Sequence, residues 1–350
     1  MPPTERTEPP NLRRAAGPLG IQTDTSIFSG EPMSLRHFLF AAVSAALSSA
    51  ALAQAYPTKP IKLIVPFPAG SATDVVARVL AEGMTRELAQ SIIVENKAGV
   101  QGTIGASEVA KAAADGYTLL VTTSTTQAAV TSLLKKVPYD PVKDFTPLGK
   151  IATTPFVLLT NDKVPATDLK SFIAYVKANP GKVRFGQGSS GSWVSGSLFA
   201  SMIGGDMQMI PYKGIPPAIT DMLGGSIEVV FADLGNAQAQ IKGGKVKAFG
   251  VTSTKRAPQL PELPAITEQV PGYELVPWFA LVGPANLPKD IAAKLTTTLQ
   301  KVLASPEAKT KLTAGGFDID STDAAGLAKL IDSEIKRWGQ LTKAAKIEAE

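Results

Sequence analysis

The sequence contains no cysteine and a single histidine among its 350 residues. Without cysteine there are no disulfides, no thiolate metal ligands and no cysteine nucleophile, although this says nothing about compartment, because many exported proteins manage without disulfides. Charged residues make up only 19% of the chain and mix both signs throughout, so the formal net charge of +5 comes without a long basic run. We therefore expect no nucleic-acid partner.

The first 55 residues differ in composition from the rest. Residues 1–32 are rich in Pro, Thr and Glu and show no hydrophobic period, which predicts a disordered extension or a segment upstream of the true start. Residues 33–55 begin with Met and contain Arg36, an apolar run over 38–47 and then small residues, the pattern of a signal peptide. The run is shorter than the ~20 residues that a membrane span needs. We expect cleavage near Ala53 to Tyr56 and an exported protein.

Cleavage of this segment changes the chemistry that the mature chain can perform. His37 lies within the predicted signal peptide, and the residues removed carry equal numbers of acidic and basic side chains, so the net charge stays +5. A mature chain without imidazole or thiol excludes Ser-His-Asp and Cys-His catalysis, histidine-ligated zinc and histidine pH switching. We predict neither catalysis nor a metal or cofactor. An enzyme would have to use Tyr212 or Lys213 with Asp233 as acid–base groups.

From Tyr56 onward short β-branched runs alternate with helical patterns, which indicates strand–helix–strand units and mostly parallel sheets. A Pro-rich stretch at 137–161 interrupts this alternation, and a strand at 277–284 leads back after a second Pro cluster. Two such crossings predict an α/β protein with a hinged cleft between two lobes, 56–155 plus 277–350 and 156–276. The expected strands are 61–67, 91–96, 117–123, 183–187, 207–212, 227–233, 246–253 and 277–284, and the expected helices are 74–90, 102–113, 126–134, 169–178, 193–203, 216–223, 237–242, 288–304, 306–314 and 323–346.

Three predicted strand-to-helix loops are rich in Gly, Ser and Thr, and occupy 66–74, 122–127 and 186–193. Loops at the carboxyl ends of parallel strands commonly bind ligands, because each following helix presents unpaired N–H groups and a partial positive charge. In the first loop Gly70 allows close approach of the backbone, and Ser124 in the second provides a hydroxyl donor for an anion. None of the three has the spacing of a phosphate-binding lysine loop or a dinucleotide fingerprint.

Each candidate also has a purely structural interpretation. Asp74 is typical of a helix first turn, and the glycines of 186–191 are typical of a tight turn. Tyr212 after its strand could be a half-buried aromatic residue, and Asp233 either caps the next helix or holds a ligand ammonium group. Trp193 is more typical of a residue packed in the protein interior than of one that stacks on a ligand. These alternatives stay open on the sequence.

Five long motifs together closely resemble the Bug receptors, the TctC-like extracytoplasmic solute receptors of tripartite tricarboxylate transporters. The resemblance spans essentially the whole mature chain. It implies a periplasmic protein with a two-lobed, type II periplasmic-binding-protein-like fold, which delivers an organic acid to a membrane permease with one large and one small integral subunit. The motifs are YPTKPIKLIVPFPAGSATDVVARVLAE (56–82), DGYTLLVTT (115–123), PYKGIPPAITDMLGGSIEVVFADL (211–234), IKGGKVKAFGVTSTKRAPQLPELPAITE (241–268) and PGYELVPWFALVGPANLP (271–288).

The resemblance also implies which residues bind the ligand. In the family, the loops after the first and third strands hold the ligand carboxylate through backbone amides, hydroxyls and ordered water, and helix amino termini can neutralise a carboxylate without an arginine. Matching motifs place these contacts at Phe67, Ala69, Gly70, Ser71, Asp74, Thr123, Ser124 and Gln127 in one lobe, and at Gly188, Ser189, Ser190, Tyr212 and Asp233 in the other.

This chain departs from the family pattern at three positions. Ser71 stands where a second glycine is usual, Trp193 lies near the position of a histidine, and Ser197 lies near the position of a glutamate. The larger, donor-only Trp193 would alter the far end of the cleft, so citrate, dicarboxylates, acidic amino acids and aromatic acids all stay open as ligands. We expect a monomer, and signalling to a membrane kinase stays open beside transport.

Overall fold

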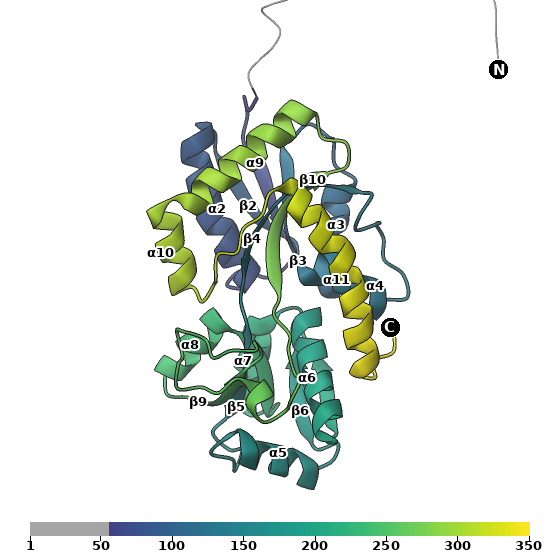
Figure 1. Ribbon diagram of the computed structural model, residues 1–350, viewed down its shortest axis with the longest axis vertical. Helices are drawn as coiled ribbons and strands as arrows, with labels where there is room; N and C mark the ends of the chain where they lie inside the picture. The colour runs from purple at the N-terminus through teal and green to yellow at the C-terminus, as the bar shows by residue number, and fades with distance from the viewer. Residues whose placement is uncertain (1–55) are drawn as a thin grey trace, which may run out of the picture. The chain divides into compact units, whose positions relative to one another are not determined.

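The computed structural model describes residues 56–350 and contains two five-stranded sheets, each flanked by helices (Figure 1). The predicted extension at 1–32 and the predicted signal peptide at 33–55 lie outside the described residues. Within the described part, no helix combines the length and the apolar character that crossing a bilayer requires. We call the sheet that contains the first strand, together with its helices, lobe A, and the other sheet with its helices lobe B.

The lobe A sheet has the strand order β2-β1-β3-β10-β4. β1 pairs in parallel with β2 and β3, whereas β10 is antiparallel to both β3 and β4, so four of the five strands run in one direction. The β1 sequence IKLIV is buried at every position except its lysine, as expected for a strand covered on both faces. The strands are β1 (Ile61–Val65), β2 (Ile92–Asn96), β3 (Thr118–Thr123), β4 (Phe145–Thr153) and β10 (Trp278–Pro284).

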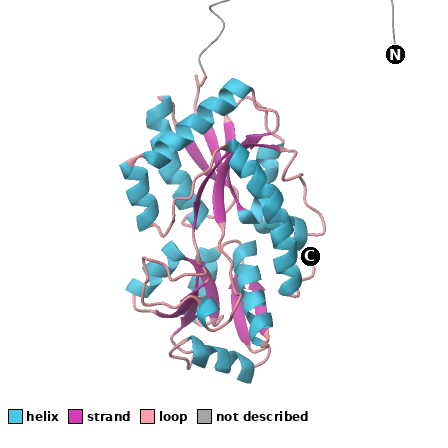
Figure 2. Cartoon of the chain, in the orientation of Figure 1, coloured by secondary structure: helices cyan, strands magenta, loops and turns pink. Residues whose placement is uncertain are grey.

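Amphipathic helices cover the lobe A sheet (Figure 2). The first of them buries Val76, Leu80 and Met84, which are spaced four residues apart and therefore lie on one face. The last one, in yellow in Figure 1, also packs against lobe B, where Ser201 donates to the carbonyl of Ala344 at 3.0 Å. The helices are α2 (Ala72–Leu88), η1 (Val100–Gly102), α3 (Thr103–Ala110), η2 (Thr125–Ala129), α4 (Val130–Leu133), α9 (Lys289–Ala304), α10 (Pro306–Ala314) and α11 (Ala324–Ala344).

The lobe B sheet repeats this design with the order β7-β6-β8-β5-β9. β6 pairs in parallel with β7 and β8, and β5 is antiparallel to β8 and β9, so again one strand opposes four. Stacked Phe172 and Phe249, with ring centroids 5.2 Å apart, fill part of its core. The elements are β5 (Phe156–Asn161), α5 (Leu169–Ala178), β6 (Val183–Gln187), α6 (Ser190–Ile203), β7 (Met207–Pro211), α7 (Ile215–Gly224), β8 (Val229–Asp233), α8 (Leu234–Lys242), β9 (Val246–Val251) and η3 (Ile266–Glu268).

The Pro-rich stretch at 137–161 interrupts the alternation of strands and helices, but it contains two strands that were not expected. It contains β4 and β5, which are separated by only Thr154 and Pro155. Pro147 lies within β4, where it is tolerated because β4 is an edge strand and its pairing with β10 shifts register beside that proline. The two lobes are therefore joined at this point by a nearly continuous extended chain. The lobe boundaries predicted above stay a prediction.

Candidate ligand site

A cavity lies where strand-to-helix loops of the two lobes meet. It holds about 450 Å³ of space not filled by protein atoms, including its opening to solvent. Its lining includes the first residues of helices from both lobes, so several helix amino termini converge on one space. The lining residues are Phe67, Ser71, Ala72, Thr73, Thr123, Ser124, Thr125, Thr154, Phe156, Gly188, Ser189, Ile215, Asp233, Pro277 and Phe279.

The entry to α2 forms one wall of the cavity. Ser71 is the N-cap residue, and its Oγ accepts a hydrogen bond from the Asp74 N–H at 3.3 Å. The N–H groups of Ala72 and Thr73 have no acceptor among the described residues. The first turn of a helix carries a partial positive charge, which is favourable for an anion. This wall therefore offers backbone donors to a carboxylate.

Asp74 does not line the cavity and instead fixes the shape of this loop. Its carboxylate accepts hydrogen bonds from Gly70 N at 3.0 Å, Arg78 Nε at 2.9 Å and Asn96 Nδ2 at 3.0 Å. Burial raises the pKa of Asp74, but these hydrogen bonds, led by that from Arg78, outweigh it and leave the pKa below its usual value. Ala69 and Gly70 are exposed and do not line the cavity. The loop after β1 thus presents Phe67 and Ser71 to the cavity.

The β3–η2 loop forms the neighbouring wall. Thr122 is hydrogen-bonded to Thr126 at 2.8 Å, and it donates to Gln127 Oε1 at 2.7 Å. Gln127 donates in turn to the carbonyl of Pro141, so it is a buried support for the loop and does not line the cavity. Ser124 does line the cavity, is completely buried, and its Oγ has no hydrogen-bond partner among the described residues. A buried hydroxyl without a partner is costly, and this one is available to donate to an acceptor in the cavity.

Lobe B contributes the start of α6, where the side chains of Ser189 and Ser192 form hydrogen bonds within the first turn. Ser189 Oγ accepts from Ser192 N at 3.2 Å, and Ser192 Oγ accepts from Ser189 N at 3.0 Å, which makes a reciprocal capping box. Gly188 lies so close to α7 that a Cβ there would be 2.4 Å from Ile215 N. Ser190 is fully buried and does not line the cavity. Its Oγ donates to Gln101 Oε1 at 3.1 Å.

Asp233 and Tyr212 have different surroundings. Asp233 lines the cavity and caps α8, accepting from Asn236 N at 3.2 Å and from Asn236 Nδ2 at 2.9 Å. Burial raises the pKa of Asp233, against the opposing effect of these hydrogen bonds. Tyr212 does not line the cavity and donates to Asp221 Oδ2 at 2.8 Å. Burial and this carboxylate raise the pKa of Tyr212 to about 12.

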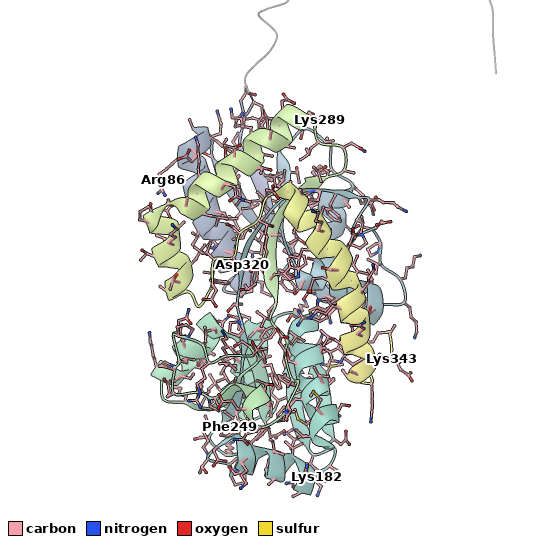
Figure 3. The ribbon with its side chains drawn as sticks, in the orientation of Figure 1. Arg86, Lys182, Phe249, Lys289, Asp320 and Lys343 are labelled. Atoms are coloured by element: carbon pink, nitrogen blue, oxygen red, sulfur yellow. The ribbon has the colours of Figure 1, made fainter. Side chains whose placement is uncertain are left out.

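The remaining walls come from residues that the sequence did not identify. Phe156, Ile215, Pro277 and Phe279 make these walls apolar, and Thr154 adds a hydroxyl. Over residues 56–350, no lysine or arginine contributes to the lining. The labelled cations Lys182 and Lys289 point outward at opposite ends of the two lobes (Figure 3). An anion in this cavity would therefore be neutralised by backbone and hydroxyl dipoles.

A family model described as the tripartite tricarboxylate transporter family receptor, TctC, matches residues 76–347. The chain belongs to this family. The protein BugT of Bordetella pertussis is 36% identical over 307 residues, which cover 86% of this chain and 93% of BugT. This match confirms the resemblance noted on the sequence motifs and identifies the protein as a solute-binding receptor of the tripartite tricarboxylate transporter type.

Solved structures of similar proteins confirm the two-lobed α/β fold. The periplasmic binding protein BugD is 34% identical with a TM-score of 0.81, over 84% of this chain and 100% of BugD. The R. palustris protein Rpa4515, solved with adipate, is 32% identical with a TM-score of 0.82, over 84% of this chain and 100% of that one. MatC from Rhodopseudomonas palustris, solved with bound malate, is 32% identical with a TM-score of 0.78, over 82% of this chain and 99% of MatC.

Proposed function

We propose that this receptor captures a small organic acid in the cavity between its lobes and delivers it, in the periplasm, to the permease of a tripartite tricarboxylate transporter. The ligand carboxylate would lie against the amino termini of α2 and η2 in lobe A. The rigid bodies that close on it would be 56–155 plus 277–350 and 156–276. The predicted signal peptide at 33–55 would direct export, and the mature receptor would act as a monomer.

The observation that carries this proposal is Ser124. Its hydroxyl is completely buried, lines the cavity and has no partner within the described part of the chain. Ala72 and Thr73, whose N–H groups begin α2, line the same cavity. A carboxylate has two oxygens that accept hydrogen bonds and so suits a hydroxyl beside a pair of N–H groups. The adipate and malate bound by the two R. palustris relatives support the same ligand class.

The arrangement of the candidate acid–base residues disfavours an enzyme. Asp233 lines the cavity, but Tyr212 and Lys213 do not. The Tyr212 hydroxyl donates to Asp221 instead, and Lys213 is exposed to solvent. A general acid or base must lie within hydrogen-bonding distance of the reacting atoms. Binding without turnover is therefore the proposal. Sensing through a membrane kinase uses the same cavity, and loss of uptake on deletion of the permease genes distinguishes transport from sensing.

The test is calorimetry of the mature protein against citrate, malate, adipate, glutamate and benzoate. We expect at least one acid to bind and Ser124→Ala to weaken its affinity about 10- to 100-fold, because a hydrogen bond to a charged group contributes roughly 1.5–3 kcal/mol. The same variant should be no less stable than wild type without ligand, since it removes a buried hydroxyl that lacks a protein partner.

Thr160 provides the matched control. It lies on β5, and its Oγ1 is also buried without a partner among residues 56–350, but it does not line the cavity. Thr160→Val should therefore leave affinity unchanged while having a similar effect on stability. Failure of every acid to bind would refute the proposed function, whereas equal affinity in Ser124→Ala and wild type would show that the β3–η2 loop does not hold the ligand.

A further inference from the structure

A side-chain hydrogen bond joins η1 of lobe A to the start of α6 in lobe B. Ser190 Oγ donates to Gln101 Oε1 at 3.1 Å. Neither residue lines the cavity, yet Ser189, the neighbour of Ser190, does. Ser190 is fully buried and Gln101 is half-buried, so this hydrogen bond is partly shielded from solvent where the lobes meet.

The backbone that presents Gln101 is held in an uncommon conformation. Val100 and Gln101 have φ angles of 45° and 54°, in the left-handed region that residues other than glycine rarely adopt. Such conformations persist where surrounding contacts impose them, and they are concentrated at functional sites. Gly102 anchors the segment, because a Cβ there would be 2.7 Å from Thr126 Cγ2 and 3.3 Å from Phe67 Cζ. The segment thus packs on both lobe A loops that line the cavity.

Two further contacts between the lobes lie close to the cavity. Asn236 Nδ2 donates to the Gly70 carbonyl at 3.4 Å, from the residue that also holds Asp233. Pro68 packs on Gly214, where a Cβ would be 2.7 Å from Pro68 Cδ. The bond between Gln101 and Ser190 is shorter than the Asn236 bond and is made entirely by side chains, so it can be removed without altering either backbone.

We infer that Gln101 and Ser190 form a clasp that sets how long the lobes stay closed over a bound ligand. Gln101 is a positioning residue, since it meets lobe B and not the cavity. Separating the lobes breaks the bond, so the clasp stabilises the closed state whatever ligand is inside. Its loss should speed the release of every ligand by the same factor. This inference rests on the proposed function for its ligand measurements, but lobe separation can be measured without ligand.

The first test is stopped-flow release of the acids that bind, with Gln101→Met and Ser190→Ala. A neutral hydrogen bond contributes about 0.5–1.5 kcal/mol, so both variants should release ligand roughly 3- to 10-fold faster, with association rates within about twofold of wild type. Ser190→Ala leaves the capping box of Ser189 and Ser192 in place. The double variant should be no faster than either single variant, because both remove one shared bond.

Gln101→Glu is the conservative control, because glutamate keeps an acceptor oxygen, and its charge suits the amino terminus of α6. It should release ligand no faster than wild type. Unchanged release in both Gln101→Met and Ser190→Ala would overturn the clasp. Factors that differ from one acid to the next would also overturn it, by showing that Gln101 contacts the ligand.

The second test measures the lobes directly and needs no ligand. Because the chain has no cysteine, Lys182→Cys and Lys289→Cys, one in each lobe, give two unique labelling sites for distance measurement by spin labels. Gln101→Met should lower the fraction of molecules in which the two labels are closer together, which is the closed state. Gln101→Glu should show the same fraction as wild type. An unchanged distance distribution would overturn the clasp even if no acid in the panel binds.

Discussion

The two lobes bring similar loops to the cavity but use their polar groups differently. In lobe A, the Ser124 hydroxyl and the first N–H groups of α2 have no partner among the described residues. In lobe B, Ser189 and Ser192 satisfy each other, and Asp233 is held by Asn236. We expect the Ser124 hydroxyl of lobe A to donate to the ligand, and lobe B to close over it with lining side chains whose hydrogen bonds are already made.

The same contrast appears in the two acidic residues at helix starts. The pKa of Asp74 in lobe A is lowered despite its burial, because three donors converge on its carboxylate. The pKa of Asp233 in lobe B is raised by burial, which outweighs the hydrogen bonds from Asn236. One carboxylate therefore stabilises its loop as an anion, whereas ionisation of the other costs stability.

The largest effect should come from Asp74→Ala. It removes the hydrogen bonds from Gly70, Arg78 and Asn96. The free energy of unfolding at pH 7 should fall by about 2–3 kcal/mol, a value that counts the Arg78 bond as weak because solvent screens its exposed side chain. A lowered pKa stabilises the fold above the unfolded value, near 3.8, and this contribution disappears as pH falls through the folded value. Urea titrations at pH 7 and pH 3 measure both.

Asp290 is the matched control for this prediction, because it is an exposed acid in the first turn of α9. Asp290→Ala should change the free energy of unfolding by at most about 0.5 kcal/mol. If Asp74→Ala costs no more than Asp290→Ala, the carboxylate does not fix the loop.

A smaller effect is expected from Gly70→Val. Gly70 has a φ of 78°, and a Cβ added there would meet nothing within 4 Å, so the cost is conformational and should be about 1–2 kcal/mol. Because Gly70 holds the loop through Asp74, ligand affinity should fall as well. Gly204→Val, at a φ of 64° and equally open at the end of α6, should lose similar stability with unchanged affinity. Calorimetry measures the affinity of each variant, and thermal melts measure its stability. Equal ligand affinities in Gly70→Val and Gly204→Val would show that the loop after β1 in lobe A does not hold the ligand.

Ser189→Ala should show the reverse of Ser124→Ala. Loss of an N-cap costs about 1 kcal/mol, so stability should fall while affinity changes less than about threefold. Ser305→Ala, which removes the N-cap of α10 and does not touch the cavity lining, should lose about the same stability. A large loss of affinity in Ser189→Ala alone would show that lobe B also provides ligand donors.

The sequence predicts most of the fold because the signals are local. α5 and α10 occupy the predicted residues, and α6 and α8 begin three residues earlier than predicted because Ser189 and Asp233 cap them. The strands β4 and β5 within 137–161 were not expected, because prolines on an edge strand resemble the composition of a loop. The direction of pairing, with one opposed strand in each sheet, depends on tertiary structure and has no local signature.

The lining residues at the first turns of helices can be predicted from the sequence. Those on the strands that connect the two lobes cannot. Ser71, Ser124 and Ser189 occupy loops whose composition identifies them. Phe156 and Phe279 line the cavity because two crossing strands end there, and their sequences are indistinguishable from core strands. Gln127 and Tyr212 lie in the right loops, but their side chains bind protein partners, which neither spacing nor composition specifies.

Asp233→Asn should have the smallest effect and the opposite sign to Asp74→Ala. A raised folded pKa means that the stabilising contribution is present below the unfolded pKa, near 3.8, and is lost as pH rises through the folded value. Asparagine keeps an oxygen for the Asn236 N–H and caps helices as well as aspartate. At pH 7 the variant should therefore be slightly more stable than wild type, and at pH 3 the two should be equal. Urea titrations that show it less stable at pH 7 would mean that the hydrogen bonds from Asn236 to the Asp233 carboxylate outweigh the cost of its burial. Lobe B would then resemble lobe A.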